Sequence, residues 1–205
     1  MPVITISGKP GSGSTTIAKL LAEKLNIKHF SAGRMWKDIA RGKIKEQYYF
    51  PIFNKLCSEK NIVLPELKAQ DDSTAVLLLW NTEIGKSLKF NEALDNLQKQ
   101  LAQEGNIVFD GKLSIHMIPD ATISVWLKGQ ERIRAKRLAE RDDKTIFQAI
   151  TMLQERETKE RKEWENMYGF DYFTQEKEAD LVVDSTEKSL EEVSDLILRE
   201  LDNKL

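Results

Sequence analysis

Residues 1–16, MPVITISGKPGSGSTT, constrain this chain more than any other stretch. Residues 2–7 form a short apolar segment typical of a buried parallel strand, a glycine-rich run from Gly8 to Gly13 follows, and helical periodicity begins at Thr15. A strand, a glycine-rich loop and a helix in this order form the context in which such a loop can bind phosphate. Glycines let successive backbone N–H groups turn toward phosphate oxygens, and the helix adds the positive end of its dipole.

The run fits the phosphate-loop pattern G-x-x-x-x-G-K-[ST] except at one position. Gly8 and Gly13 have the required spacing, and Thr15 stands where a hydroxyl would bind Mg²⁺. Ser14 replaces the lysine that normally reaches the β- and γ-phosphates, so it offers a hydrogen bond but no charge. Lys9 lies inside the loop and could supply part of that charge. The alternative is a glycine-rich turn with no ligand. We predict a phosphate site formed by Gly8, Lys9, Pro10, Gly11, Ser12, Gly13, Ser14, Thr15 and Thr16.

The length of 205 residues suits one α/β domain with a small lid. Lys and Arg (31) nearly balance Asp and Glu (33), so we expect no nucleic-acid partner that depends on a basic face. The single Cys57 cannot form an internal disulfide, which indicates a reducing compartment. No apolar run is long enough to cross a bilayer and the N-terminus lacks a basic leader, so we expect no membrane partner and a cytoplasmic location.

Strands and helices alternate along most of the chain. We expect strands at residues 2–7, 28–30, 107–110, 123–127 and 181–184. We expect helices at residues 15–25, 34–41, from 91 to a stop at Gly105-Asn106, at 131–167 with a break near Asp142-Asp143, and at 190–201. This alternation predicts a doubly wound parallel sheet. The sequence of residues 42–90 gives weaker signals. We expect this segment to be mostly helical and to lie beside the sheet. It would serve either as a packing excursion or subunit contact, or directly in the chemistry.

Asp110 follows a buried apolar strand, where phosphate-loop enzymes carry a second carboxylate. At that position it could hold Mg²⁺ through water or bind a hydroxyl or base of an acceptor. Asp184 also ends a strand, and such an aspartate often only caps a turn. The Gly111-Lys112 pair favours Asp110, because a glycine lets the backbone approach a ligand.

The helical zone after residue 130 is rich in arginine. Several guanidinium groups at one site would match the charge on the equatorial oxygens of a transferred phosphoryl group. The alternative is a solvated helix laced with Glu–Arg pairs. His29 and His116 have neither a Cys-His cluster nor a nucleophile beside them, so neither zinc binding nor acyl transfer is supported. The arginines are Arg132, Arg134, Arg137, Arg141, Arg156 and Arg161, and the second, third and fourth of these share a helix face.

The stretch ISGKPGSGSTTIAKLLAEKLNIKHFSAGRMWKDIA resembles the opening of archaeal-type cytidylate kinases, in the nucleoside monophosphate kinase group of P-loop NTPases. DNLQKQLAQEGNIVFDGKLS, ISVWLKGQERIRAKRLAERDD, RETKERKEWENMYGFDY and LVVDSTEKSLEEV follow in the order that the family has. The resemblance covers roughly residues 1–41 and 91–200. It implies a three-layer α/β/α fold in one domain, residues 1–205, with a helical monophosphate-binding insertion at 42–90 and a short helical lid at about 129–165.

The resemblance also implies roles for individual residues. Residues 8–16 would hold the ATP phosphates, with Thr15 on Mg²⁺. Arg137 and Arg141 would lie on the ATP side of the lid, while Arg156 and Arg161 would clamp the transferred group. The residues implied for the nucleoside monophosphate are Ser31, Gly33, Lys37, Asp95, Gln98 and the Asp110-Gly111-Lys112 turn.

Some positions depart from the family pattern. Lys37 and Lys112 stand where arginine is expected, which removes a bidentate fork, and Asp110 stands where glutamate is usual. The chain is also longer between Gly33 and Asp95. We expect phosphoryl transfer from ATP–Mg²⁺ to CMP or dCMP by a monomer or homodimer. The alternatives are another acceptor (AMP, UMP or a non-nucleotide alcohol), or a nucleotide-binding regulatory protein with weakened catalysis.

Overall fold

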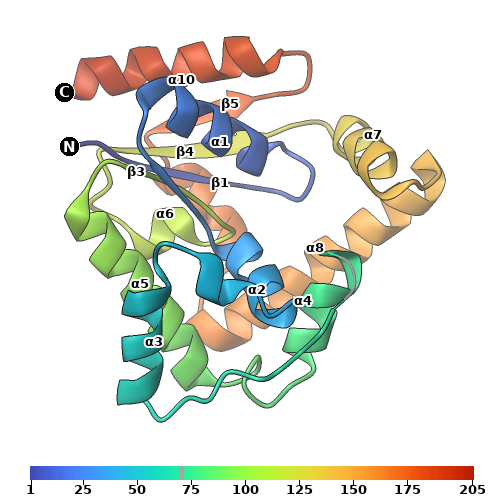
Figure 1. Cartoon of the computed structure of the whole chain (residues 1–205). Coiled ribbons are helices and arrows are strands. Elements are labelled where there is room, and N and C mark those ends of the chain that lie inside the picture. Colours follow the sequence, from blue (N-terminus) through green and yellow to red (C-terminus); the bar gives the residue numbers. More distant parts are fainter. Residues whose placement is uncertain (70–71) are drawn as a thin grey trace. The chain divides into compact units, whose positions relative to one another are not determined.

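The computed structural model describes residues 1–69 and 72–205, and the chain divides into two compact units (Figure 1). The first unit, Met1–Phe30 with Asn106–Leu205, contains the predicted phosphate loop, and the second is Ser31–Gly105. The predicted boundaries of the insertion and of the lid stay predictions.

A five-stranded sheet forms the centre of the first unit. Its strands are β1 (Val3–Gly8), β2 (Lys28–Ser31), β3 (Ile107–Asp110), β4 (Ile123–Lys128) and β5 (Leu181–Asp184), in the order β2-β3-β1-β4-β5. β1 runs parallel to β3 and β4, and β4 runs parallel to β5. The order reverses at β1, so the predicted α/β fold with a doubly wound parallel sheet is confirmed. Because Ile6 pairs with Asp110, the carboxyl ends of β1 and β3 lie side by side.

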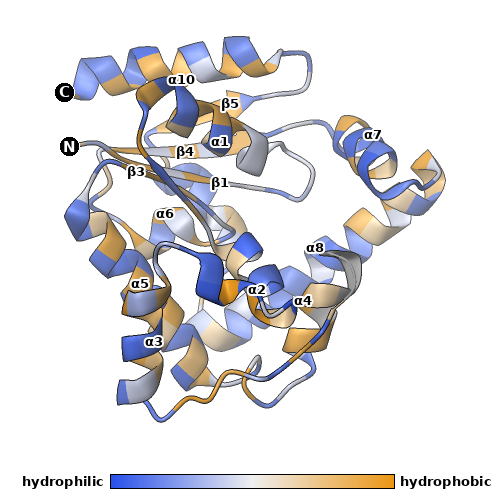
Figure 2. Cartoon of the chain, viewed as in Figure 1, coloured by the Kyte–Doolittle hydropathy of each residue, from blue (hydrophilic) through white to orange (hydrophobic). Residues whose placement is uncertain are grey.

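Helices flank both faces of this sheet (Figure 1). α1 (Ser14–Leu25) and α10 (Leu190–Lys204) pack on one face, where they bury Leu21 and Ile197 against Ile4 and Ile6. Hydrophobic and hydrophilic residues alternate in stripes along α10 (Figure 2), as expected for a helix with one buried face. The other face carries α6 (Ser114–Met117), the 3₁₀ turn η2 (Tyr172–Thr174) and α9 (Gln175–Glu178).

The predicted long charged helix is two helices that pack together, α7 (Glu131–Asp142) and α8 (Ile146–Tyr168). α7 ends where Asp143 takes a left-handed conformation, with φ 51°. α8 begins with a capping box, in which Thr145 and Gln148 satisfy each other's backbone N–H groups. The predicted break near Asp142-Asp143 is therefore confirmed.

Arg134 attaches α7 to the phosphate loop. Its side chain is buried and donates to the carbonyl of Gly129 at 2.9 Å and to that of Pro10, in the loop, at 2.9 Å. It also forms an ion pair with Glu157 on α8. One buried guanidinium thus joins the loop, α7 and α8, a geometry that its five fixed donors permit.

The second unit is helical, apart from its connections and the end of β2. It contains α2 (Ala32–Ala40), η1 (Ile44–Glu46), α3 (Phe50–Glu59), α4 (Asp72–Trp80) and α5 (Leu88–Glu104). Aromatic rings fill its core: Trp36 lies 5.5 Å from Trp80 and 5.4 Å from Phe90, and Phe53 lies 6.1 Å from Phe90, between ring centroids. The helices predicted at 34–41 and from 91 are present as α2 and α5, and the apolar run at 75–80 belongs to α4.

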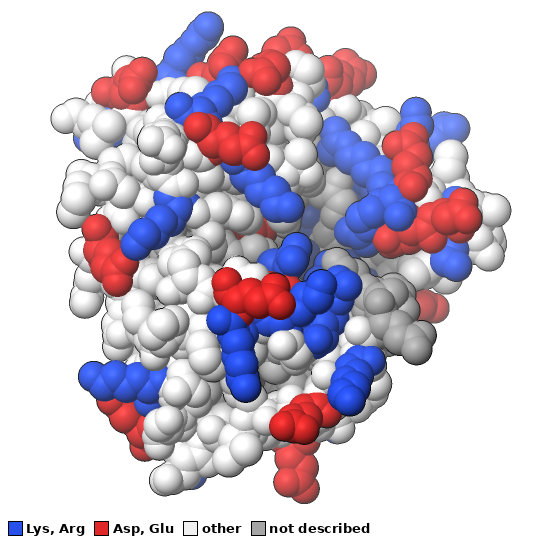
Figure 3. All heavy atoms as spheres, in the orientation of Figure 1, with Lys and Arg blue, Asp and Glu red and all other residues white. Residues whose placement is uncertain are grey.

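Charged side chains of both signs are interspersed on the face of the molecule shown in Figure 3. Within residues 1–69 and 72–205, no helix combines the length and the apolar character needed to cross a membrane.

The buried Cys57 gives a test of how the second unit packs. Its thiol lies in α3 at 2% exposure, and burial raises the pKa of this thiol to about 11. We expect the native protein to react with a disulfide-exchange reagent at pH 8 at least roughly 10²-fold more slowly than the urea-unfolded chain. The reagent cannot reach the buried thiol, and little of this thiol is ionised at pH 8. Equal rates in the native and unfolded protein would contradict the packing of α3.

Arg134 gives a second test, on the unit that holds the loop. Arg134→Ala would leave the half-buried Glu157 carboxylate without its cation and the Pro10 carbonyl without its donor. We expect the free energy of unfolding in urea to fall by about 3–5 kcal/mol. The exposed Arg132 on the same helix provides the control, since Arg132→Ala should cost less than about 0.5 kcal/mol. Equal costs for the two variants would contradict the anchoring role.

Candidate active site

Two glycines of the phosphate loop lie closer to neighbouring backbone than any other residue could. A Cβ on Gly8 would lie 2.4 Å from the carbonyl oxygen of Leu127 on β4, and one on Gly11 would lie 2.7 Å from that of Arg134 on α7. Gly11 and Gly13 also have positive φ angles, 77° and 94°. The loop therefore needs its glycines both for its turns and for the close approach of β4 and α7.

α1 begins directly after the loop. Its N-cap is Gly13, which has no side chain with which to cap the first N–H groups, and its first turn has no acidic residue. The hydroxyl of Ser12, in the loop, is buried and has no hydrogen-bond partner among the described residues. Backbone donors, a helix dipole and an unsatisfied buried hydroxyl together fit a polyphosphate group.

Thr15 and Asp110 meet at the carboxyl edge of the sheet. The Thr15 hydroxyl donates to Asp110 Oδ2 at 2.7 Å, and His29 Nε2 lies 3.1 Å from Asp110 Oδ1. The structure thus brings Thr15, which the sequence predicted for Mg²⁺, next to Asp110, which was predicted either to hold Mg²⁺ through water or to bind an acceptor group. Within the described ranges no cluster of three or more His, Cys, Asp or Glu side chains could hold a metal ion. An oxygen pair of this kind fits Mg²⁺ nevertheless, because Mg²⁺ is usually held by one or two protein oxygens together with substrate phosphates and water.

The Gly111-Lys112 turn follows Asp110 and carries a half-buried ion pair. Lys112 Nζ lies 3.3 Å from the carbonyl oxygen of Gly8 and 3.3 Å from Glu160 Oε2, on α8. Glu160 also accepts from Arg156 Nε at 2.7 Å and from the Tyr172 hydroxyl at 3.1 Å. Burial lowers the pKa of Lys112 to about 8 although Glu160 opposes this shift. For Glu160, burial favours a higher pKa, but Lys112 and Arg156 outweigh it and lower the pKa.

The structure separates the predicted lid arginines into different environments. Arg137 contacts the loop: it donates to the Ser12 carbonyl at 3.3 Å and to the Ser185 hydroxyl at 3.0 Å, after β5. Arg141 lies at the exposed end of α7, where it forms a two-pronged ion pair with Asp142. Arg161 pairs with Asp171 just beyond α8.

The residues predicted for the monophosphate in the second unit lie on α2 and α5. Ser31 is the N-cap of α2, and its hydroxyl accepts from the Arg34 N–H at 3.2 Å. Gly33 and Lys37 follow on the same helix, and a Cβ on Gly33 would meet nothing within 4 Å. Asp95 and Gln98 lie on α5, where Gln98 is buried.

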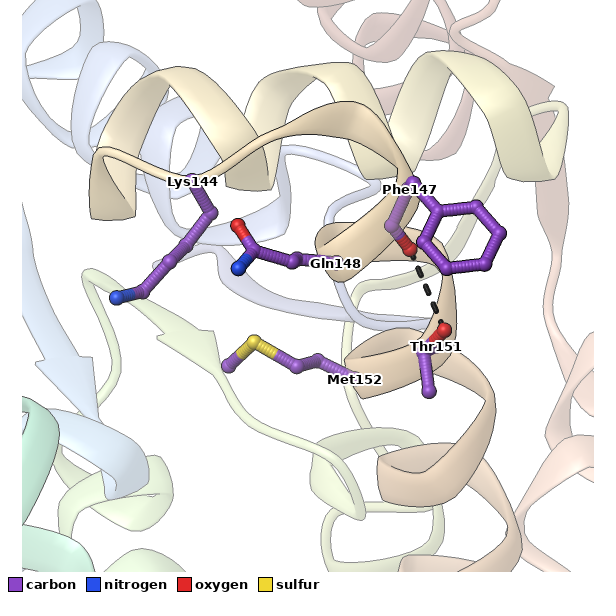
Figure 4. Close-up of a pocket in the computed structure, with 5 residues that line it drawn as sticks. All are labelled: Lys144, Phe147, Gln148, Thr151 and Met152. Atoms are coloured by element: carbon purple, nitrogen blue, oxygen red, sulfur yellow. Dashed lines mark hydrogen bonds between the residues drawn. The ribbon is translucent and has the colours of Figure 1, made fainter.

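A shallow cavity of about 450 Å³ lies at the start of α8 (Figure 4). Lys144, Phe147, Gln148, Thr151 and Met152 line it, and the Thr151 hydroxyl donates to the Phe147 carbonyl (Figure 4). Phe147 is 81% exposed, so this cavity is an open surface of the helix pair. It brings together none of the residues predicted for chemistry.

Several contributors were missed by reasoning from the sequence. His29 was set aside, although it contacts Asp110; only knowledge that β2 lies beside β3 would have indicated this. Glu160 looked like one member of a surface charge pattern. No pattern in the sequence links Phe173 to Lys9 of the loop, although the Lys9 Nζ lies 4.3 Å from the centroid of the Phe173 ring.

Comparisons with known proteins show which family this chain belongs to. A sequence profile of the cytidylate kinase-like family matches residues 3–187. The chain is 29% identical to the cytidylate kinase of Methanococcus aeolicus over 206 residues, covering 98% of each protein. It is 32% identical to the cytidylate kinase of Pyrococcus horikoshii over 169 residues, which cover 82% of this chain and 72% of that protein.

Solved structures of low sequence similarity have the same fold. The shikimate kinase of Bacteroides thetaiotaomicron superposes with a TM-score of 0.54 at 16% identity, covering 98% of each chain. That likeness concerns the fold alone. The length and extent of the profile match, together with the similarity to the archaeal enzymes, show that this chain belongs to the cytidylate kinase-like family.

Proposed function

We propose that this protein transfers the γ-phosphoryl group of ATP to CMP, with dCMP as a second acceptor. The observation that carries the proposal is the contact between Thr15 and Asp110 at 2.7 Å, which joins the phosphate loop to the end of β3. In a member of the cytidylate kinase-like family, this pair lies where the loop meets the topological switch point of the sheet, and ligands bind at such points.

The residues in and around the loop would bind both the phosphates of ATP and Mg²⁺. The phosphate oxygens would be bound by backbone N–H groups at the start of α1, by the Ser12 hydroxyl, and by the cations Lys9 and Arg137. Thr15, with Asp110 directly or through water, would hold Mg²⁺. When bound, Mg²⁺ supplies positive charge that offsets the charge on the β- and γ-phosphates. The residues proposed for ATP are Gly8, Lys9, Pro10, Gly11, Ser12, Gly13, Ser14, Thr15 and Thr16.

The reaction needs no covalent bond to the protein. A phosphate oxygen of CMP attacks the γ-phosphorus, the bond from that phosphorus to the bridging oxygen breaks, and ADP and CDP result. The protein would act by holding the two phosphates in line and by placing positive charge around them. We propose this charge role for Arg137, Arg141, Arg156 and Arg161.

We propose acceptor-binding residues in each of the two units. In the second unit these are Ser31, Gly33 and Lys37 on and before α2, with Asp95 and Gln98 on α5. In the first unit they are the Asp110-Gly111-Lys112 turn. Lysine at positions 37 and 112 binds phosphate as a point charge without the fork of arginine, so we expect weaker orientation of the monophosphate than arginine would give.

We further propose a cytoplasmic enzyme that works as a monomer or homodimer, with no nucleic-acid or membrane partner. The balanced charge and the single buried thiol support this location and this choice of partners.

An acceptor panel tests the function. ADP production from ATP–Mg²⁺ is followed with CMP, dCMP, UMP, AMP and no acceptor in parallel. We expect turnover with CMP or dCMP to exceed the blank by roughly 10²-fold or more, because catalysis by positioning requires the correct acceptor. Turnover that is highest with AMP or UMP would reassign the acceptor. Turnover that never exceeds the blank, with ATP bound, would contradict kinase function.

Asp110→Asn tests the carboxylate that carries the proposal. The change keeps the shape and the acceptor for Thr15 but removes the charge, so we expect kcat to fall roughly 10²-fold and the Mg²⁺ concentration for half-maximal rate to rise. Asp184→Asn is the matched control, because Asp184 also ends a strand but accepts local hydrogen bonds, from the N–H and the hydroxyl of Thr186. Similar losses in both variants would contradict a specific role for Asp110.

A further inference from the structure

The loop of this chain lacks a charge at the position where the phosphate-loop pattern has lysine, because Ser14 stands there. Lys9 is the one basic residue between Gly8 and Thr16. A lysine side chain has four rotatable bonds, and it loses rotamer entropy when it is fixed. A lysine at a different loop position can replace the missing charge only if another group holds its ammonium in place.

The structure contains such a group in Phe173, on η2. Lys9 Nζ lies over the Phe173 ring, 4.3 Å from its centroid. The face of an aromatic ring attracts a cation through its quadrupole within about 6 Å. The ring has no net charge, so it holds the ammonium without neutralising it. The Asp171 carboxylate, which forms its ion pair with Arg161, also attracts Lys9. Lys112 shows the contrast, since its ammonium is paired with the Glu160 carboxylate.

The Phe173 ring is itself held in place by the first unit. It makes an edge contact with the fully buried Trp126 of β4, with ring centroids 6.4 Å apart. Its backbone N–H donates to Asp171 Oδ1 at 3.1 Å. The buried Gln175 side chain donates to the carbonyls of Tyr172 and Lys112, both at 2.8 Å, and so ties η2 to the turn after β3. A ring fixed in this way can orient a flexible lysine.

The same ring also carries a second cation. Arg161 Cζ lies 4.7 Å from the Phe173 centroid, and the guanidinium is bonded to both carboxylate oxygens of Asp171. The hydrogen bonds from Arg161 hold the pKa of Asp171 below its usual value, so the pair stays charged. Phe173 therefore lies against one cation of the loop and one cation of α8. A cavity of about 390 Å³, lined in part by Arg161 and Phe173, opens beside them.

We propose that Phe173 is a positioning residue for ATP binding: its ring holds the Lys9 ammonium beside the loop and thereby compensates for Ser14. This inference rests on the proposed function, because it takes residues 8–16 as the site of the nucleotide phosphates. It adds to that function a source for the missing lysine charge, and it assigns a binding role to an aromatic residue outside the loop.

A double-mutant cycle tests the proposal, with ADP–Mg²⁺ as the probe and its Kd measured by calorimetry. Phe173→Leu removes the aromatic face but keeps an apolar side chain, and we expect the Kd to rise roughly fivefold. In a Lys9→Met background the same change should alter the Kd less than about twofold, because the ring then has no ammonium to hold. A purely structural role for Phe173 would give the same loss in both backgrounds.

Two further variants separate positioning from folding. Phe170→Leu makes the same change at another half-buried phenylalanine of this segment, which stacks on His116 at 4.0 Å and should leave the Kd within about twofold of wild type. Phe173→Tyr keeps the ring and should retain wild-type affinity.

Each result then has one meaning. Additive losses in the cycle, tighter ADP binding by Phe173→Leu, or a loss in Phe173→Tyr as large as that in Phe173→Leu would overturn the positioning role while leaving the kinase proposal in place. Failure of the wild-type protein to bind ADP–Mg²⁺ would overturn both.

Discussion

The hydrogen bond between Thr15 and Asp110 is the contact on which the proposed chemistry depends. It exists because β1 and β3 are neighbours in parallel register, so the loop after β1 and the carboxylate that ends β3 meet at one edge of the sheet. The reversal of strand order at β1 opens this edge to a ligand. The glycines let β4 and α7 approach the loop from the other side, through contacts that a side chain would block.

The basic residues around this edge divide between structure and chemistry. The buried guanidinium of Arg134 donates hydrogen bonds to the Pro10 and Gly129 carbonyls and pairs with Glu157. These contacts hold the loop and α7 together. Arg137 contacts the loop from the same helix but remains half-buried. Lys112 and Arg156 share the Glu160 carboxylate, which keeps two cations together near the start of the loop. Such sharing limits the cost of burying charge.

Much of this arrangement could be predicted from sequence, because strand ends in a parallel sheet meet at one edge. That rule indicated Asp110 as a candidate ligand at the carboxyl edge of the sheet, and helix signals located the break between α7 and α8. The contact of His29 with Asp110 could not be predicted, because it depends on which strand lies beside β3. Periodicity placed Arg134 and Arg137 on one helix face, but only packing distinguishes the buried anchor from the half-buried one. The contact of Phe173 with Lys9 joins residues far apart in sequence, for which no local pattern exists.

The proposed function requires that the γ-phosphoryl group of ATP moves to CMP and not to water. Phosphorus-31 NMR of the protein with ATP–Mg²⁺ and CMP follows every phosphate at once. We expect the signals of CMP and of the ATP γ-phosphate to decline together while the signals of CDP and ADP rise in equal amounts. The appearance of ADP with inorganic phosphate and with unchanged CMP would contradict the proposed function.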